Sequence, residues 1–424
     1  MKTIIRGGRI IDPANKIDMI ADLMIEDNTI VAVAKDINQD ADKVIDATSC
    51  YVMPGLIDMH VHLRDPGLTY KEDIESGAKA AAKGGFTTIL AMPNTKPIID
   101  DAKGIEYVMN QASKVAPIKV LQVGAITNNQ EGKELADIEA MIKAGSPAIS
   151  EDGKSVMNAK LYREGMKLAA QCDIPVLAHC EDIDMVDGGC VNADETTAKM
   201  GLKGITNAVE DVIVARDIIL AKETNAHLHL CHCSTKDSVN MVDKAKQDGI
   251  KVTAEVCPHH FTLTTQDIIA NDTNYKMNPP LRTDEDVKAL KCGLQEDIIE
   301  VISTDHAPHS NEEKDTTMEE APFGIVGLET CVALTISELV KPKVITPMQM
   351  AEKLSYNPAQ ILKLDRGTLT VGKVADITVI NPDIAYQIDT SDFISKGKNT
   401  PFGGREVKGQ VVYTICEGEV VYKA

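Results

Sequence analysis

The sequence lacks any run of about 18 apolar residues, which is the length that a membrane-spanning helix requires. Its first residues also lack the long apolar core of a secretory signal. The ten cysteines form no C-x-x-C pair, and the single residue between Cys231 and Cys233 matches neither a zinc-ribbon nor a thioredoxin spacing. We therefore expect reduced thiols and a cytoplasmic location.

Positive charge is scarce relative to negative charge. The 44 lysines and arginines face 64 aspartates and glutamates, for a formal net charge of −20. An acidic surface repels nucleic-acid backbones and anionic lipids, so neither nucleic acid nor a membrane is an expected partner. The 424 residues are enough for one large α/β barrel and a smaller accessory domain.

No G-x-G-x-x-G motif follows a predicted strand and opens a helix, which disfavours a doubly wound dinucleotide-binding sheet. Instead, residues 54–362 alternate short apolar strands with amphipathic helices. The predicted strands are Ile57–His62, Thr87–Met92, Val120–Ile126, Ala148–Ser150, Pro175–His179, His227–His232, Lys251–Val256 and Ile299–Thr304. The predicted helices include Glu72–Lys83, Ile105–Lys114, Lys160–Gln171, Val209–Lys222 and Lys236–Gln247. Eight strands with intervening helices predict an α/β fold, a closed (β/α)8 TIM-type barrel.

Both ends of the chain contain short β-like runs punctuated by Gly, Asn and Asp. This pattern predicts that residues 1–53 and 363–424 pair into one small β-domain. The predicted organisation is thus a central barrel, residues 54–362, with a β-domain formed by both termini.

Four histidines and an aspartate fall at the C-terminal ends of predicted strands. His60 and His62 are two residues apart, so on a strand their side chains point to the same face. His179, His232 and Asp305 end the fifth, sixth and eighth predicted strands. Any one of these histidines could be a structural residue, but catalytic groups of barrels gather at this end of the strands. Imidazoles and a carboxylate converging there predict a site for an ion such as zinc.

The segment Ile57–Gly67, which contains both first-strand histidines, resembles the opening signature of the amidohydrolase superfamily in its dihydroorotase form. The resemblance extends over nearly the whole chain and includes Ala91–Thr95, Met277–Arg282, Thr304–His309 and Asn357–Gln360. It implies a (β/α)8 barrel with a small β-domain built from both termini, in agreement with the pattern of strands.

The resemblance also implies one or two zinc ions per subunit. The implied ligands are His60, His62 and Asp305 for one ion, and His179 and His232 for the other. Many relatives bridge the two ions with a carboxylated lysine at the end of the fourth strand, where this chain has no lysine. Asp152 resembles the aspartate that replaces this lysine in one bacterial branch, whereas Lys154 is expected to be a solvated loop residue.

The activity that the resemblance implies is the reversible cyclisation of N-carbamoyl-L-aspartate to L-dihydroorotate, in de novo pyrimidine (UMP) biosynthesis. Zinc lowers the pKa of its water to about 7, so that a hydroxide can attack the cyclic amide, with Asp305 as the proton shuttle. Arg64 and Asn94 would bind the substrate carboxylate, since a guanidinium matches its planar fork. Further expected substrate contacts are His62, Asn278, His309, Phe323 and Gly324.

Other polar residues have plainer interpretations. His227 and His229 have the opposite strand parity from His232, so the three cannot all face the lumen, and His227 and His229 are expected to be wall residues. His259 and His260 are expected to support the mouth at most. Residues 311–315 are expected to form a solvated loop, with a mobile flap over the site as the alternative.

Two alternative functions remain open from the sequence. One is a different cyclic amidohydrolase, a hydantoinase or allantoinase. The other is a non-catalytic structural partner of aspartate carbamoyltransferase, although such relatives lose metal ligands and this chain keeps them. The resemblance implies two candidate partners, a second copy of the chain and aspartate carbamoyltransferase.

Overall fold

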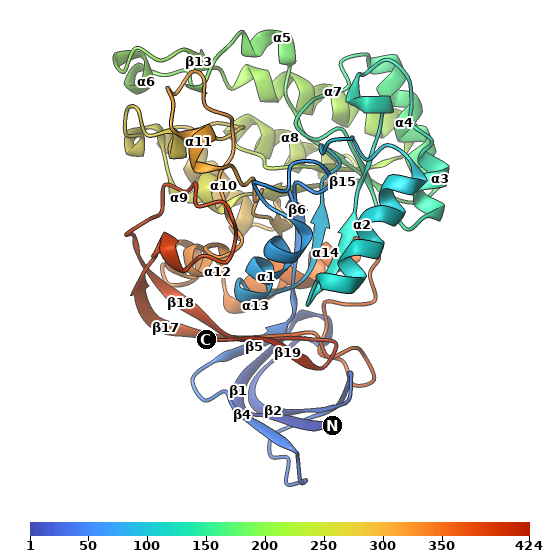
Figure 1. The fold of residues 1–424 in the computed structure, drawn as a ribbon, viewed down its shortest axis with the longest axis vertical. Coiled ribbons are helices and arrows are strands. Elements are labelled where there is room, and N and C mark those ends of the chain that lie inside the picture. The colour runs from blue at the N-terminus through green and yellow to red at the C-terminus, as the bar shows by residue number, and fades with distance from the viewer.

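The fold, given by a computed structural model, is described for residues 1–424, and its upper part in Figure 1 is built on parallel strands. One three-stranded sheet has the order β6-β7-β8, and a six-stranded sheet has the order β16-β15-β14-β11-β10-β9. Their bounds are Leu56–Val61 (β6), Phe86–Ala91 (β7), Lys119–Gln122 (β8), Gly124–Ala125 (β9), Ile149–Ser150 (β10), Pro175–Ala178 (β11), His227–Leu230 (β14), Val252–Val256 (β15) and Val301–Ile302 (β16). Every strand predicted for the middle of the chain overlaps one of these strands.

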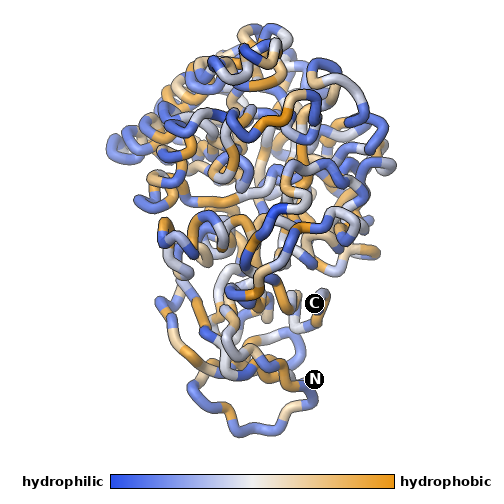
Figure 2. The backbone as a smooth tube through the Cα atoms, turned by 90° about the vertical axis from the view of Figure 1, so that its left-hand side faces the viewer, coloured by the Kyte–Doolittle hydropathy of each residue, from blue (hydrophilic) through white to orange (hydrophobic).

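The two parallel sheets are neighbours in space as well as in sequence. Only Val123 separates β8 from β9, and an isolated parallel bridge joins Val61 to His306, just beyond β16. Buried apolar side chains from β6, β7, β11 and β16, among them Ile57, Leu90 and Leu177, form a common core. Figure 2 shows apolar backbone concentrated inside this part, with hydrophilic segments around it.

Helices surround the parallel strands in Figure 1. They are Ile74–Lys83 (α1), Ala102–Val115 (α2), Ile138–Lys143 (α3), Ala159–Gln171 (α4), Ile183–Val186 (α5), Glu195–Lys199 (α6), Ala208–Thr224 (α7), Lys236–Gln247 (α8), Pro258–Thr262 (α9), Asp284–Gln295 (α10), Asn311–Lys314 (α11), Cys331–Thr335 (α12), Pro347–Ala351 (α13) and Asn357–Ile361 (α14). The five predicted helices correspond to α1, α2, α4, α7 and α8. No helix is both long enough and apolar enough to span a bilayer.

Side-chain caps fix where several of these helices begin. Asp73 accepts a hydrogen bond from Ser76 N, 2.8 Å away, and so satisfies a backbone donor that has no partner inside α1. Asn158 caps α4 and Thr235 caps α8 in the same manner. Each cap follows a strand-end segment, so the loop conformation at the C-terminal ends of the strands is set locally.

An eight-stranded sheet lies below the parallel strands in Figure 1, and both termini lie beside it. Its order is β19-β18-β17-β5-β1-β2-β3, with β4 paired to β1. The bounds are Lys2–Asp12 (β1), Ile17–Glu26 (β2), Thr29–Ala34 (β3), Lys43–Asp46 (β4), Tyr51–Pro54 (β5), Ile377–Gln387 (β17), Glu406–Cys416 (β18) and Glu419–Lys423 (β19). The antiparallel pairing of β5 with β17 joins the N-terminal strands to the C-terminal strands.

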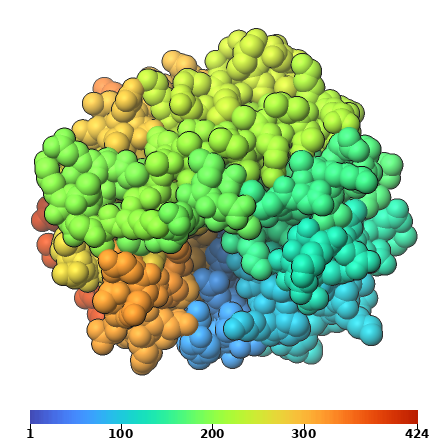
Figure 3. Space-filling view, turned by 90° about the horizontal axis from the view of Figure 1, so that it is seen from above, coloured from blue at the N-terminus to red at the C-terminus, as the bar shows by residue number.

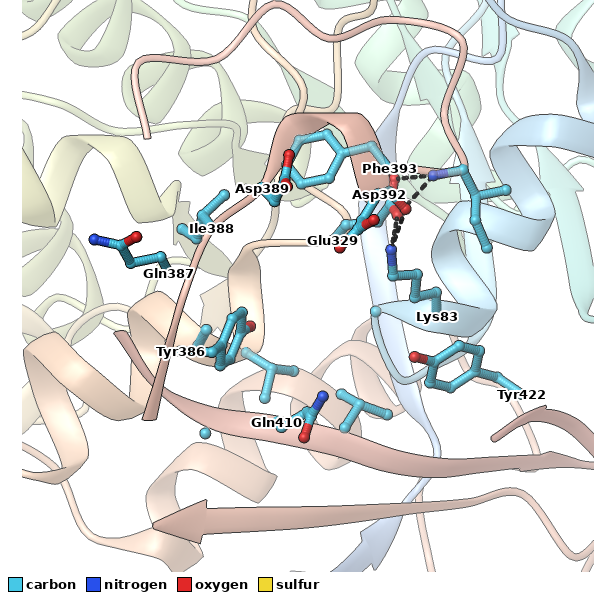
Figure 4. Close-up of a pocket in the computed structure, with 16 residues that line it drawn as sticks. Lys83, Glu329, Tyr386, Gln387, Ile388, Asp389, Asp392, Phe393, Gln410 and Tyr422 are labelled. Atoms are coloured by element: carbon cyan, nitrogen blue, oxygen red, sulfur yellow. Dashed lines mark hydrogen bonds and ion pairs between the residues drawn. The ribbon is translucent and has the colours of Figure 1, made fainter. Parts of the chain in front are cut away.

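The link between β17 and β18, residues 388–405, leaves this sheet and crosses to the strand-end loops; we call it the C-terminal strap. Glu329 accepts hydrogen bonds from the backbone N–H groups of Ile394 and Ser395, and Lys83 pairs with Glu329 at 3.0 Å. Figure 4 shows Lys83 and Glu329 at one side of a cavity of about 440 Å³ that Tyr386 and Tyr422 also line. This cavity shares no residue with the histidine-lined cavity described below.

Candidate metal centre and substrate cavity

The predicted site residues come together at the C-terminal ends of the parallel strands. A cavity of about 200 Å³ opens there, and Figure 3 shows the hollow from above, where segments from distant parts of the sequence meet. All of the predicted site residues except His60, which is fully buried, line this cavity, together with Gly153 and Ala307. The lining residues are His62, Arg64, Asn94, Asp152, Gly153, His179, His232, Asn278, Asp305, Ala307, His309, Phe323 and Gly324.

Asp152 occupies the centre of the histidine group. Its Oδ1 lies 3.1 Å from His60 Nε2, and its Oδ2 lies 3.5 Å from His62 Nε2. The same Oδ1 lies 3.9 Å from His179 Nδ1 and 4.0 Å from His232 Nε2. One carboxylate thus faces histidines of both predicted sets of metal ligands.

The remaining ligand atoms converge on the same space. Asp305 Oδ1 lies 3.1 Å from His62 Nε2 and 3.6 Å from His60 Nε2. On the other side of Asp152, His179 Nδ1 and His232 Nε2 are 2.8 Å apart. His232 reaches this position because β14 ends at Leu230 and His232 itself adopts φ 34°.

The ionisation states of the clustered carboxylates and of His232 favour the binding of a cation. Burial raises the pKa of Asp152, but the neighbouring His60, His62 and His179 together outweigh it and hold that pKa well below the usual range. The pKa of Asp305 is lowered in the same way, against its burial, chiefly by His60. Burial and the adjacent His179 lower the pKa of His232 to about 3, which keeps that imidazole neutral.

His60 differs from His232. Burial lowers the pKa of His60, but the carboxylates of Asp152 and Asp305 outweigh it and raise that pKa well above the usual value. Although His60 Nε2 and Asp152 Oδ1 are buried side by side, neither atom makes a hydrogen bond. Buried polar atoms without partners are rare, and a cation between them would satisfy both. The nitrogen and carboxylate donors therefore fit zinc.

The lining of the cavity also carries positive charge, from Arg64. Arg64 is 9% exposed and adopts φ 59°, and its Nε donates to Pro308 O at 3.2 Å. Its Nη2 lies 3.5 Å from His309 Nε2, which in turn lies 2.8 Å from Phe323 O. The guanidinium is thus held from one side while its remaining N–H groups are available to an anion.

Two predicted substrate residues are also bound to other groups of the site. Asn94 lies 2.9 Å from His62 Nδ1 through its oxygen and donates to Asp152 Oδ2 at 3.0 Å through its nitrogen. Asn278 donates to Glu181 Oε1 at 2.7 Å. Asn94 therefore orients two candidate metal ligands, His62 and Asp152, and this role does not depend on a contact with the substrate.

The sequence did not indicate several residues that shape the rim. Lys71 Nζ lies 2.7 Å from Glu313 and 3.3 Å from His309 Nδ1. In the C-terminal strap, Asn399 accepts from His309 N at 3.0 Å and donates to the carbonyls of Ala307 and Gly324. Neither residue belongs to a local motif that would have marked it.

The prediction of a solvated loop at residues 311–315 is only partly right, because Asn311, Glu312 and Asp315 are exposed but the segment is helical and anchored. Asn311–Lys314 form helix α11, and Glu313 is tied to the cavity rim. The buried Lys314 donates to the carbonyls of Thr273, Lys276 and Pro322. Its exposed residues, Glu312 and Asp315, make the run acidic, whereas the buried Lys314 anchors it.

Neither His227 nor His229 lines the cavity, which agrees with their prediction as wall residues, but the parity argument behind that prediction fails for His229. His229 is fully buried and lies 3.1 Å from Glu255, the carboxylate that contacts His60. The argument failed because the chain leaves strand geometry after Leu230, so that alternation cannot be counted on to His232. His259 and His260 are buried in the first turn of α9, and His260 Nε2 lies 2.9 Å from Pro279 O.

Comparisons with known proteins agree with this arrangement. Residues 50–238 match a family model described as dihydro-orotase-like. The dihydroorotase of Clostridioides difficile (strain 630) is 48% identical over 99% of this chain and 100% of its own length. The dihydroorotase of Geotalea daltonii is 46% identical, with 100% of both chains covered.

Solved structures of hydantoinases share the fold. The L-hydantoinase (dihydropyrimidinase) from Arthrobacter aurescens superimposes with a TM-score of 0.88 at 26% identity, covering 99% of this chain and 96% of that one. The dihydropyrimidinase from Brevibacillus agri gives 0.84 at 24% identity, covering 100% and 95%. Because full-length relatives reach 48% identity, the chain belongs to the dihydroorotase family of cyclic amide hydrolases.

Proposed function

We propose that this chain interconverts N-carbamoyl-L-aspartate and L-dihydroorotate, and so serves de novo pyrimidine biosynthesis. The observation that carries the proposal is that one cavity is lined by two kinds of group. Histidines and carboxylates suited to zinc line it together with the Arg64 guanidinium. Dihydroorotate has a cyclic amide for the first kind of group and a carboxylate for the second, whereas hydantoin and allantoin lack that carboxylate.

We propose two zinc positions that share Asp152. His60, His62 and Asp305 would hold one ion, since their ligand atoms lie within 4.8 Å of one another. His179 and His232 would hold the second. When bound, zinc supplies Lewis acidity that activates water near neutral pH and polarises a carbonyl group.

Asp305 is the proposed proton carrier. Its lowered pKa keeps the carboxylate ionised, the form that can accept a proton from the attacking water. In ring opening, the proton would pass from Asp305 to the amide nitrogen as the carbon–nitrogen bond breaks. In cyclisation the same carboxylate would take the proton from that nitrogen and return it to the departing water.

Arg64 would bind and orient the substrate carboxylate, with Asn94 and His309 beside it. A guanidinium donates two parallel hydrogen bonds to a carboxylate, which fixes both its position and its plane. Asn278, Phe323 and Gly324 line the cavity beyond them and would contact the ring.

We further propose that the parallel strands close into a (β/α)8 barrel spanning residues 54–362, with residues 1–53 and 363–424 forming the small domain. The Val61–His306 bridge and the 2.8 Å hydrogen bond from His62 N to His306 O support closure between the first and last strands. The pairing of β5 with β17 supports one domain made from both termini.

A second copy of the chain is a proposed partner, and helix α7 offers a surface for it. Val212 and Ile219 on α7 are 48% and 66% exposed. Asp211 and Lys222 stand near opposite ends of the helix, so an antiparallel pair of α7 helices would bring opposite charges together. Aspartate carbamoyltransferase as a partner, and a cytoplasmic location, remain predictions from the sequence.

A substrate assay tests the proposed function. Purified, zinc-supplemented protein should open L-dihydroorotate and cyclise N-carbamoyl-L-aspartate, followed by the absorbance of the ring amide. Hydantoin and allantoin, offered at the same concentration, should be turned over at least 100-fold more slowly. A preference for either of these uncharged rings would contradict the proposal and support the hydantoinase alternative.

A further inference from the structure

A buried carboxylate on β15 supports the candidate metal ligands from below. Glu255 has no exposed surface. Its Oε1 lies 2.8 Å from His60 Nδ1 and accepts from the backbone N–H of His232 at 3.2 Å. Its Oε2 lies 3.1 Å from His229 Nε2. Glu255 therefore contacts one candidate ligand of each proposed zinc position, and neither contact involves a substrate.

From His229 the hydrogen bonds continue through Thr253 to the half-buried His227. Thr253 Oγ1 lies 2.9 Å from His229 Nδ1 and 3.0 Å from His227 Nε2. Since a hydroxyl group has one hydrogen, it donates to one ring and accepts from the other.

The hydrogen bond between His229 and Glu255 has a defined direction. An ionised carboxylate accepts only, so His229 must donate to Glu255 from Nε2. Burial lowers the pKa of His227 to about 4, so the His227 ring is neutral near pH 7. Thr253 Oγ1 joins this ring to His229 Nδ1, so that His229 is held at both of its nitrogens.

We propose that Glu255, held by His229, is a positioning residue that fixes His60 in the tautomer with its proton on Nδ1. In that tautomer the lone pair of His60 Nε2 faces Asp152, where the proposed ion would bind. Carboxylates that accept from a metal-binding histidine in this way orient the ring and increase its basicity. The inference rests on the proposed function, because it assumes that His60 binds the metal ion.

The hydrogen bond that Glu255 accepts from His232 N indicates a second role for Glu255. His232 lies outside regular strand geometry, at φ 34°, so strand pairing alone does not fix it. By accepting from its backbone, Glu255 holds in place the turn that aims His232 at His179. One carboxylate thus sets the spacing between a ligand of the first ion and a ligand of the second.

Zinc affinity of the whole chain tests this role, measured by competition of metal-free protein with a chromophoric chelator. Glu255→Gln should weaken zinc binding by 10- to 100-fold, because the amide nitrogen cannot accept from a ring N–H group. The absorption spectrum of the cobalt-loaded variant should change as well, since it reports the ligand geometry. The matched control is Glu300→Gln, whose carboxylate accepts from Ala254 N and pairs with Lys246 away from the histidines.

A pair of substitutions at His229 keeps the test decisive if Glu255→Gln does not fold. His229→Gln retains an N–H group that can donate to Glu255 and should bind zinc within threefold of the wild type. His229→Leu removes that donor and should weaken zinc binding at least tenfold, with circular dichroism of the metal-free protein unchanged.

The outcomes separate this inference from the proposed function. Wild-type protein that does not bind zinc would overturn both. Wild-type protein that binds zinc, with Glu255→Gln or His229→Leu binding it equally well and with the same cobalt spectrum, would overturn the positioning role alone.

Discussion

Asp152 Oδ1 and His60 Nε2 lie 3.1 Å apart in the interior, and neither atom makes a hydrogen bond. The same carboxylate also faces His179 and His232 within 4.0 Å. A single aspartate thus stands between the two sets of candidate metal ligands. With the two proposed zinc positions, this arrangement would make metal binding at one position depend on the other.

Removing this carboxylate should therefore affect both positions. Asp152→Asn keeps the shape of the side chain but removes its charge, and we expect the zinc content per subunit to fall and turnover to drop at least 100-fold. Metal analysis by mass spectrometry after dialysis, together with the dihydroorotate assay, checks this. Asp187→Asn, at an 81% exposed carboxylate, is the control. Full zinc content in Asp152→Asn would show that the histidines and Asp305 suffice.

The proton carrier has a separate test. Asp305→Asn removes the group that accepts the proton, and general acid–base catalysis contributes typically 10²- to 10⁴-fold. We expect kcat to fall by that factor in both directions of the reaction, while the circular dichroism spectrum stays that of the wild type. Turnover within fivefold of the wild type would mean that another group carries the proton.

Arg64 should act on binding more than on bond breaking. Charge-assisted hydrogen bonds are worth about 1.5–3 kcal/mol, so Arg64→Met should lower kcat/KM by about 10- to 100-fold, mainly through KM. Arg64→Lys keeps the charge but not the planar fork, and it should recover only part of the loss. Arg163→Met, in a surface ion pair, is the control. Unchanged kinetics in Arg64→Met would remove the residue from the substrate site.

The pH dependence of stability has a contributor behind the candidate metal centre. Burial raises the pKa of Asp217 to about 6, although Arg216, 2.8 Å away, lowers it in part. Between about pH 4 and pH 6 the folded chain therefore retains a proton that the unfolded chain has lost. Stability from this group is present below pH 4 and is lost as the pH rises to 6, by at most about 3 kcal/mol.

Chemical unfolding of the wild type and of Asp217→Asn, from pH 4 to pH 6.5, measures this contribution. An amide stays neutral, so the variant should gain stability relative to the wild type as the pH rises, and the difference should level off above pH 6. A difference that does not vary with pH would contradict the raised pKa of Asp217.

The metal side of the site could be read from the sequence because its residues end successive strands. His60, His62, His179 and Asp305 follow apolar runs, and the geometry of parallel strands brings such ends together. The substrate side needed the family resemblance, since an arginine or an asparagine in a loop has no periodic signal. The extents of the longer helices, such as α8, followed from amphipathic spacing.

Residues that make contacts distant in sequence and that belong to no motif were not predictable. Glu255 sits inside a strand, 195 positions from its partner His60, and nothing in the local pattern sets it apart from a strand carboxylate at the surface. The parity argument for His229 failed because alternation breaks where β14 ends. Asn399 lies in a segment without motif or periodicity, and only the folded chain reveals its contacts with the loop of His309.

The C-terminal strap, residues 388–405, affects both the synthesis of the enzyme and its inactivation by proteolysis. The ribosome delivers all six candidate metal-binding residues long before Asn399, which ties down the loops carrying His309 and Gly324. A nascent or truncated product that stops near residue 390 would carry its metal ligands yet leave those loops untethered. Cleavage of the C-terminal strap would release the same loops. It would therefore inactivate the enzyme, although the cleaved bond lies far from the reacting atoms.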